Sequence, residues 1–250
     1  MGKTLELAKS QGALKTRKVN NILKHKSDKV KQIFSHFLII DFEATCWQQK
    51  PGPPSEIIEF PAVLLNGETG DVVKTFHHYV QPTEEPQLSE FCRDLTGITQ
   101  DQVEKAAPIG PVLMLFNNFL KSLDVKFNES SLKNCAVVTW TDWDMKVCLE
   151  HECKRKKLIY PPCLKYWIDL KLIYKKFYNR KPQGLNGALK EMGMAFEGRE
   201  HSGLDDAKNT AKLVYKMIQD GCLLGLTKGL NDVKLDPKLA FNLEPKVPTT

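Results

Sequence analysis

A pair of carboxylates ends the apolar stretch FLIIDFEATCW, which runs from Phe37 to Trp47. Asp41 follows four apolar residues, and Glu43 stands two positions later. Side chains two positions apart in an extended strand share one face, so Asp41 and Glu43 point the same way. Two carboxylates that close repel each other, and burying them unpaired is costly. Either a hard divalent cation lies between them, or the strand ends in water and the acids face solvent.

A third acid, Asp144, follows another apolar stretch, CAVVTW at 135–140, and lies near the start of an expected helix at 142–157. It begins a stripe of residues with the spacing of one helical face. Two alternatives remain at this position. Thr141 and Asp144 also fit the pattern of a helix capping box, and Asp142 competes with Asp144 as the functional acid.

The segment HSGLDD at 201–206 precedes the strongest amphipathic helix pattern in the chain. At about 100° per residue, Asp206 borders the apolar stripe of this helix, whereas Asp205 points nearly opposite and suits the positive end of the helix dipole. His201 lies in the glycine-containing loop before the helix. A histidine in a loop is commonly just solvated. One placed five residues before an inward-facing acid is a candidate general base, because imidazole titrates near neutral pH.

The elements that must position these residues alternate between strands and helices. Strands are expected at 36–40, 56–66 and 72–82, and their short links favour an antiparallel meander in which Pro61 marks an irregularity or an edge. Helical patterns cover 111–123, 142–157, 184–194 and 201–221, a capping-box pattern occurs at Thr99 and Gln102, and 166–178 starts as a strand and turns helical. The fold class is therefore α/β, a mixed sheet flanked by helices that spans residues 35–226.

The composition sets broad limits on the kind of protein. The chain has 250 residues, of which 42% are hydrophobic and 26% charged, as is ordinary for a globular protein. No apolar run approaches the length of about 20 residues that a membrane helix needs, so we expect no membrane association. Seven cysteines, an odd count without a CxxC pair, fit reduced thiols. We expect an intracellular protein, nuclear, cytoplasmic or both.

The positive charge of the chain is concentrated at its N-terminal end. Residues 1–35 hold nine Lys or Arg and two Asp or Glu, whereas the rest of the chain is close to neutral. A basic arm ahead of a near-neutral domain suits attraction to a polyanion, and a solvated, partly disordered tail explains the pattern equally well. We therefore expect a basic, flexible tail at 1–34 and a C-terminal tail at 227–250.

Taken together, these motifs resemble those of the DEDDh exonucleases. DFE at 41–43, an acid after a strand, and His-x4-Asp before a helix stand in the order of that family's three motifs. More narrowly, EIIEFPAVLLN, LSEFCRDLTGITQDQV, WDM and HSGLDD resemble the Eri-type 3′-to-5′ exoribonucleases, and VVTWTDWD and LEHECKRKK resemble the second member of that family. The resemblance covers nearly the whole domain. It implies a ribonuclease H-like fold with every motif position present.

The resemblance implies hydrolysis of phosphodiesters with two metal ions. Asp41, Glu43, Asp144 and Asp206 would bind two Mg²⁺ ions, for which Mn²⁺ can substitute, and His201 would act as the general base. Nucleoside 5′-monophosphates would then be released from single-stranded 3′ ends. The resemblance favours RNA, and DNA stays open because accepting RNA depends on room for a 2′-hydroxyl.

Contacts with the substrate are implied as well. By position in the family motifs, Phe91 and Trp143 are candidates to stack on the terminal base, with core packing as the alternative. Backbone groups at Ala44 and Thr45 are candidates to meet the 3′ sugar, and His201 also belongs to this substrate-binding set.

Two basic clusters, Lys154–Lys157 and the cations between Lys171 and Lys181, either follow the rest of the nucleic acid strand or are ordinary solvated faces. Two rival functions remain, a module that holds nucleic acid without cutting it and a scaffold that acts through its basic tail. A metal-dependent nuclease assay distinguishes the first rival, and deletion of the tail distinguishes the second. The sequence names no protein partner. The family's second member can continue into a C-terminal zinc-binding module, whereas this chain ends at Thr250 without it.

Overall fold

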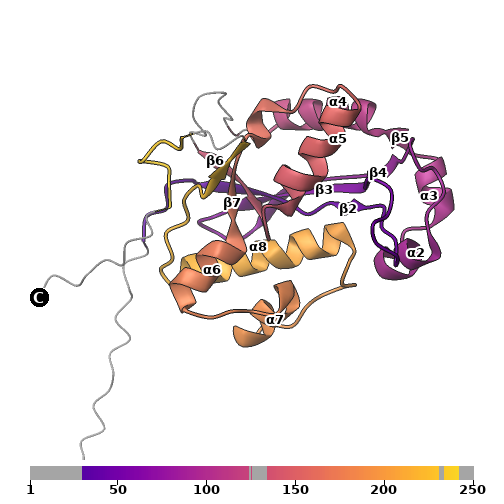
Figure 1. Cartoon of the computed structure of the whole chain (residues 1–250). Helices are drawn as coiled ribbons and strands as arrows, with labels where there is room; N and C mark the ends of the chain where they lie inside the picture. Colours follow the sequence, from indigo (N-terminus) through magenta and orange to yellow (C-terminus); the bar gives the residue numbers. More distant parts are fainter. Residues whose placement is uncertain (1–29, 124, 126–133, 231–233, 242–250) are drawn as a thin grey trace, which may run out of the picture.

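The computed structural model describes residues 30–123, 125, 134–230 and 234–241, and one mixed β-sheet forms its centre (Figure 1). The strand order is β5-β4-β3-β1-β6-β7-β8, and the short β2 also pairs with β3. The strands are β1 (His36–Ile40), β2 (Glu43–Ala44), β3 (Ile57–Asn66), β4 (Val72–Gln81), β5 (Ala107–Pro108), β6 (Cys135–Thr139), β7 (Tyr166–Asp169) and β8 (Lys228–Gly229).

The first three long strands form the antiparallel meander that the sequence predicts. β1 pairs with β3 and β3 pairs with β4, both antiparallel, whereas β6 lies parallel to β1 and β7 parallel to β6. Pro61 does not lie on an edge strand. The pairing of β3 with β1 ends at Ala62, and the pairing of β3 with β2 begins at Glu59. Pro61 lies between these two paired stretches. The predicted irregularity is therefore present, and the predicted edge position is wrong.

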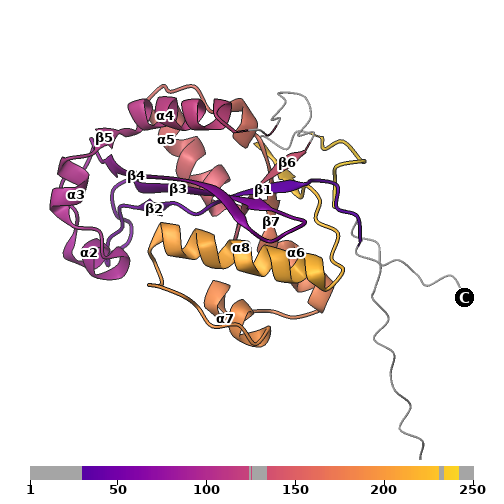
Figure 2. The same ribbon diagram turned by 180° about the vertical axis from the view of Figure 1, so that it is seen from behind.

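Helices cover both faces of the sheet because the strands send alternate apolar side chains into two cores. On β1, Leu38 and Ile40 join the core beneath α4 (Ile109–Lys121), whereas Phe37 and Ile39 join the core beneath the other helices. Those helices are α6 (Leu170–Tyr178), α7 (Gly184–Glu191) and α8 (Gly203–Gln219). Figures 1 and 2 show α4 and α5 (Glu150–Arg155) on one side of the sheet and α6, α7 and α8 on the other. None of the helices that the structure describes has the length and apolar composition needed to cross a lipid bilayer.

The helix predicted at 142–157 is built in two parts. A π-helical turn at Trp143–Leu149 leads into α5 (Glu150–Arg155). At the end of the sheet near β5, α2 (Glu90–Thr96) and α3 (Gln100–Glu104) enclose a small third core. The capping box predicted at Thr99 and Gln102 is formed with both of its hydrogen bonds. A short 3₁₀ turn, Pro162–Leu164, precedes β7.

Both ends of the domain extend further than the sequence predicts. Phe34 is fully buried, and the Gln32 side chain donates a hydrogen bond to the carbonyl oxygen of Cys222 at 2.8 Å. At the other end, β8 pairs with β7 beyond the predicted boundary at residue 226. Residues 30–34, 227–230 and 234–241 therefore belong to the domain. The rest of the predicted tails, at 1–29, 231–233 and 242–250, lies outside the described residues.

Two of the predicted site acids follow neighbouring parallel strands. Asp41 comes directly after β1, and Asp144 comes a few residues after β6. Because β1 and β6 are parallel, with Ile39 opposite Val138, their carboxyl ends meet at the same edge of the sheet. Ligands of open α/β sheets bind at such an edge. The topology therefore brings the first and second motifs together.

Candidate active site

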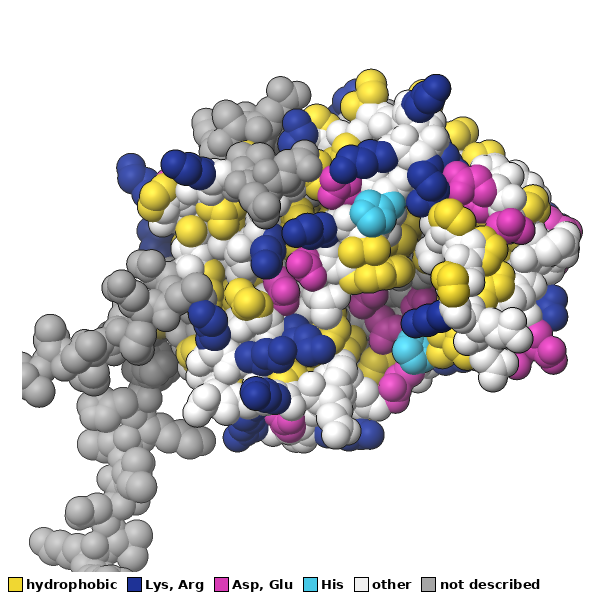
Figure 3. All heavy atoms as spheres, in the orientation of Figure 1, with side chains coloured by type: hydrophobic (Ala, Val, Ile, Leu, Met, Phe, Trp, Pro, Cys, Tyr) yellow, Lys and Arg dark blue, Asp and Glu magenta, His cyan; other side chains and the backbone are white. Residues whose placement is uncertain are grey.

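One cavity at this edge of the sheet gathers the predicted acids and the predicted histidine. It has a volume of about 540 Å³, and Figure 3 shows acidic side chains in a hollow on this face of the molecule. Its walls come from the end of β1, from β2, from the π-helical turn, from the region of α7 and from the start of α8. The predicted residues that line it are Asp41, Glu43, Ala44, Thr45, Trp143, Asp144, His201 and Asp206.

Asp144 is held by the chain segment that follows β1. It is buried in the π-helical turn, a rare geometry that is frequent at functional sites. Its Oδ1 accepts a hydrogen bond from the backbone N–H of Phe42 at 2.9 Å. The alternative capping box is not formed, because the Thr141 hydroxyl accepts from the N–H of Trp143 instead. The competing acid, Asp142, is not among the residues that line the cavity.

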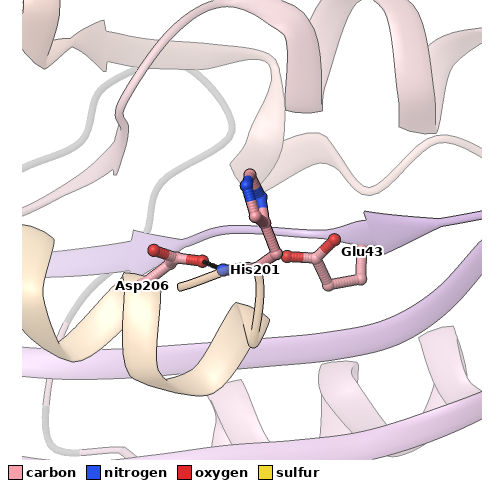
Figure 4. A group of neighbouring side chains, drawn as sticks. All are labelled: Glu43, His201 and Asp206. Atoms are coloured by element: carbon pink, nitrogen blue, oxygen red, sulfur yellow. Dashed lines mark hydrogen bonds between the residues drawn. The ribbon is translucent and has the colours of Figure 1, made fainter. Parts of the chain in front are cut away.

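His201 and Asp206 are joined in one tight turn at the start of α8. His201 has a left-handed φ of 63°, which is uncommon for a residue with a side chain, and its backbone N–H donates to Oδ2 of Asp206 at 2.8 Å (Figure 4). Such a conformation persists only where the surrounding structure enforces it. One ligand atom each from Glu43, His201 and Asp206 lie within 4.8 Å of one another. Three separate segments of the chain therefore supply one group of potential ligands.

Burial, and then the crowding of the acids, raises their pKa values. Burial, followed by the charges of Asp206 and Glu59, raises the pKa of Glu43 to about 9. Burial raises the pKa of Asp144 to about 7 and that of Asp206 to about 7, in each case against an opposing hydrogen bond from the backbone. Burial and the neighbouring Asp144 raise the pKa of Asp41 well above its ordinary range. A divalent cation would relieve this repulsion, because it favours the charged form of every carboxylate near it.

The chemistry of these donors fits hard cations. Carboxylate oxygens are the protein ligands that Mg²⁺ and Mn²⁺ prefer. Within the described part of the chain, no Lys, Arg or His side chain forms a salt bridge with any of these acids. Their negative charge is therefore not compensated by the protein itself. The four acids with this property are Asp41, Glu43, Asp144 and Asp206.

Sequence reasoning misses Glu59, a fifth carboxylate beside the cavity. Glu59 is only 2% exposed, and its carboxylate accepts hydrogen bonds from the backbone N–H groups of Gly203 at 2.9 Å and Leu204 at 3.2 Å. Its Oε1 also lies 2.8 Å from Nε2 of His77. Glu59 therefore ties the first turn of α8 to β3. One feature of the sequence could have indicated Glu59, since it is a charged residue inside the apolar run IIEFPAVLL. A carboxylate buried in such a strand is almost always paired with another group.

Gly203 allows α8 to approach the end of β1. A Cβ atom at this position would lie 2.6 Å from the carbonyl oxygen of Asp41 and 3.2 Å from Oε2 of Glu59. Close approach of two backbones is one of the uses of glycine. The helix that carries Asp206 can therefore reach the strand end that carries Asp41 because residue 203 has no side chain.

Comparison with known proteins identifies the family. Residues 38–214 match the family model described as Exonuclease (RNase T). ERI1 exoribonuclease 2 from Danio rerio is 50% identical over 245 residues, which cover 94% of this chain and 44% of that protein. The nuclease domain of 3′hExo, described as a DEDDh family member bound to rAMP, has a TM-score of 0.73 at 40% identity, over 79% of this chain and 98% of that chain. A 3′-exonuclease described in 3′-end-specific recognition of the histone mRNA stem-loop has a TM-score of 0.73 at 39% identity, over 80% of this chain and 88% of that chain. This chain belongs to the Eri-type exonucleases of the DEDDh family.

The predicted family and the predicted ribonuclease H-like α/β fold are both confirmed. The chain spans 44%, 33%, 35% and 37% of the lengths of four curated relatives named ERI1 exoribonuclease 2. It therefore corresponds to less than half of each of those proteins.

The two predicted base-stacking residues of this exonuclease domain fall in different places. Trp143 is 40% exposed and lines the cavity. Phe91 is 39% exposed on α2, one turn before Leu95, and the cavity lining includes Leu95 but not Phe91. Stacking by either ring stays a prediction, and the geometry favours Trp143.

Ala44 and Thr45 both line the cavity, but Thr45 already has partners. Its backbone N–H donates to the carbonyl oxygen of Glu56 at 2.8 Å, and its hydroxyl accepts from the N–H of Glu56 at 2.9 Å. The backbone N–H of Thr45 is therefore already paired, and a sugar contact from another backbone group of Thr45 stays a prediction. A contact from Ala44 stays a prediction.

The first predicted basic cluster of the exonuclease domain is largely neutralised within the chain. The partners are Glu150 for Lys154 at 2.5 Å, Glu84 for Arg155 at 3.1 Å, and both Glu56 and Glu152 for Lys156 at 2.6 and 2.7 Å. Three of its four cations are therefore already paired with acids, which favours the alternative that this cluster is an ordinary surface of the domain. These ion pairs instead attach α5 to the start of β3 and to the segment after β4.

One wall of the cavity comes from a region to which sequence reasoning assigned no function. It lies around α7 and the segment before α8, where the Asn186 amide donates to the Glu200 carboxylate. No motif marks this wall in the sequence, because its residues share only their position in the fold. They are Gln183, Gly184, Leu185, Asn186, Phe196 and Glu200.

Proposed function

We propose that this chain is a metal-dependent 3′-to-5′ exonuclease that releases nucleoside 5′-monophosphates from single-stranded 3′ ends, RNA in preference to DNA. The observation that carries the proposal is the convergence of four uncompensated acids beside one imidazole in a single cavity. Membership of the DEDDh family supports it, as do relatives named exoribonucleases and a relative bound to rAMP.

The four acids would hold two Mg²⁺ ions, with Mn²⁺ as a substitute. When bound, the ions supply Lewis acidity that offsets the negative charge of the phosphodiester and stabilises the leaving oxygen. By family similarity, Asp41 would be shared by both ions. Glu43 and Asp206 would complete the site of one ion, and Asp144 would support the other. Burial keeps water away from these carboxylates and strengthens their interaction with a cation.

His201 would remove a proton from the attacking water. Its imidazole is exposed, and one of its ring nitrogens lies within 4.8 Å of carboxylate oxygens of Glu43 and Asp206. The water oxygen forms a bond to phosphorus while the bond from phosphorus to O3′ of the preceding nucleotide breaks. His201 holds the proton from the water, and the departing O3′ takes up a proton from solvent. The phosphate then stays on the 5′ carbon of the released nucleoside.

The single-strand preference follows from how the terminal base would be held. Trp143 offers a partly exposed ring in the cavity lining, and an unpaired base is free to turn away from its neighbours and stack on it. Stacking tolerates every base, so we expect weak sequence preference at the 3′ end. The preference for RNA is supported by the relatives named exoribonucleases and by the relative described with the histone mRNA stem-loop.

The direct test uses single-stranded RNA and DNA of equal sequence, labelled at the 5′ end and incubated with Mg²⁺, Mn²⁺ or EDTA. We expect a ladder that shortens one nucleotide at a time from the 3′ end, release of nucleoside 5′-monophosphates, faster loss of RNA than of DNA, and no reaction in EDTA. Asp41→Asn should abolish the ladder while its circular dichroism spectrum matches that of the parent. Internal cuts, products with a 3′-phosphate, or bound but intact RNA in the presence of Mn²⁺ contradict the proposal, and the last result favours a binding module.

A further inference from the structure

We propose that Lys171, Lys175 and Lys228, together named the lysine face, bind the backbone phosphates of the nucleotides that precede the 3′-terminal one. The lysine face lies on α6 and β8, outside the three exonuclease motifs. The inference rests on the proposed function for the direction of the strand, and its test includes a binding measurement that does not require cleavage.

No ion pair holds the charges of the lysine face among the described residues. Lys171, Lys175 and Lys228 form no salt bridge and donate no side-chain hydrogen bond within that part of the chain. In this respect they differ from Lys154 and Lys156, whose charges are paired with buried or partly buried glutamates. Uncompensated lysines on one surface attract a polyanion.

Lys171 connects the lysine face to the cavity. Its Nζ lies 5.9 Å from the centre of the Trp140 ring, and Trp140 lines the cavity. The backbone N–H of Lys171 also donates to the carbonyl oxygen of Trp140 at 3.0 Å, which fixes the start of α6 beside the cavity wall. A strand whose 3′ end occupies the cavity and that leaves it past Trp140 therefore meets Lys171 first.

Lys175 and Lys228 come from different elements but act on the same residue, Asp169. Asp169 caps α6 by accepting a hydrogen bond from the N–H of Leu172 at 2.9 Å. Lys228 stands opposite Trp167 in the pairing of β8 with β7, and Asp169 lies two residues further along β7. Burial raises the pKa of Asp169, and the positive charges of Lys228 and Lys175 oppose that rise. Lys175 also lies one helical turn after Lys171 and shares its side of α6. The three lysines therefore form one group.

The position of this group suits a charged strand. Figure 3 shows Lys and Arg side chains over α6 on the same face of the molecule as the hollow that holds the acids. The cavity acids repel phosphates, so a favourable route for the rest of the strand needs positive charge at the mouth of the cavity. Separate lysines act as point charges and do not read base edges, so the expected ligand is the phosphate backbone of any single-stranded sequence.

The test compares two triple variants of the full chain with the same change in charge. Lys171→Gln/Lys175→Gln/Lys228→Gln removes the lysine face, and Lys105→Gln/Lys154→Gln/Lys216→Gln removes three lysines that are already paired with neighbouring acids. Binding of a 5′-labelled single-stranded RNA is measured with Ca²⁺ in place of Mg²⁺ over a series of salt concentrations. Cleavage of a dinucleotide, which has no upstream phosphates, is measured in parallel with Mg²⁺.

We expect the lysine-face variant to bind the long RNA more weakly and the slope of log K against log salt to flatten by about 2, because each phosphate contact to a single strand contributes about 0.7. The control variant should keep the slope of the parent, and both variants should cleave the dinucleotide at the parent rate. Two results would overturn the inference. One is the same salt slope in both variants, and the other is a loss of dinucleotide cleavage in the lysine-face variant as large as its loss of long-RNA binding. If the parent binds RNA but cleaves nothing, the proposed function fails and the slopes still decide this inference.

Discussion

The buried carboxylate of Glu59 accepts a hydrogen bond from the backbone N–H of Gly203 at 2.9 Å, which joins β3 to the first turn of α8. The N–H of Leu204 donates to the same carboxylate at 3.2 Å. Ser202, at the N-cap position of α8, makes no side-chain capping bond. Glu59 therefore caps the helix from another strand, and the position of Asp206 depends on a residue outside the family's three motifs.

We expect Glu59→Ala to lower the free energy of unfolding by about 2 kcal/mol, because buried N–H groups of α8 lose their acceptor. Glu59→Gln keeps one acceptor oxygen and should lose less. Urea denaturation followed by circular dichroism measures both. The alanine variant should also need more Mn²⁺ for half-maximal activity, since α8 carries Asp206. Equal unfolding energies for the two variants would show that packing, and not hydrogen bonding, holds α8.

The contact of Gly203 with the end of β1 gives a second prediction. In Gly203→Ala the new Cβ lies 2.6 Å from the carbonyl oxygen of Asp41, so backbone must move, at a cost of about 1–3 kcal/mol. Gly110→Ala is the matched control, because its Cβ would have its nearest neighbour at 3.5 Å. The control should gain roughly 0.5 kcal/mol from helix propensity. Thermal unfolding measures both effects, and a Gly203→Ala protein as stable and active as the parent would contradict the tight contact.

Raised pKa values in the cavity predict how stability changes with pH. The pKa values of Asp144 and Asp206 are each about 7 and that of Glu43 is about 9 in the folded, metal-free protein, above their ordinary values. Folding therefore takes up protons. The contribution of these groups to stability is complete below the unfolded pKa values, about 4, and is lost as the pH rises through 7 and 9.

In EDTA, we therefore expect the melting temperature to fall between about pH 5 and pH 8. Saturating Mg²⁺ should raise it more at the higher pH, because the cation then no longer competes with protons for the carboxylates. Asp41→Asn, which removes one charge from the group, should flatten the decline in EDTA. Differential scanning fluorimetry over the pH series checks all three statements. A Mg²⁺-induced shift of the same size at every pH would contradict them.

Local spacing was enough to predict the parts of the site that lie within one element. Alternation along a strand predicts that Asp41 and Glu43 share one side, and both line the cavity. Helical periodicity predicts that Asp206 points inward and Asp205 outward. Asp206 lines the cavity, and Asp205 does not. The contact between Glu59 and Gly203 joins positions 144 residues apart. Such a contact depends on how α8 packs on β3, which no local pattern encodes.

The basic run at 154–157 is a second case in which tertiary contacts, and not local sequence alone, decide the role of a residue. In sequence, Glu152 stands four positions before Lys156, the spacing of an ion pair on one face of a helix, and the two side chains are paired at 2.7 Å. The fold brings Glu56 to 2.6 Å from the Lys156 ammonium, although the two residues are 100 positions apart. Whether a lysine is free to bind RNA is therefore decided by tertiary contacts. The lysine face was included in the second basic cluster only through Lys171 and Lys175, and Lys228 was assigned to a tail.

The different positions of Trp143 and Phe91 allow a matched comparison. The two rings are almost equally exposed, at 40% and 39%, but only Trp143 is among the residues that line the cavity. We expect Trp143→Ala to raise KM for single-stranded RNA by about tenfold, since a base stack contributes about 1–3 kcal/mol. Phe91→Ala should raise it less. Steady-state kinetics on one RNA substrate measures both, and a larger effect of Phe91→Ala would mean that the strand crosses α2.

If His201 is the general base, its removal should slow the chemical step and leave RNA binding intact. His201→Ala should lower kcat by about 10²–10⁴-fold, the usual contribution of a positioned acid or base, and leave the affinity for RNA in Ca²⁺ nearly unchanged. His151→Ala is the control, because His151 is an exposed histidine on α5 outside the cavity lining. If affinity falls as much as kcat, His201 holds the substrate, and the proton must leave by another route.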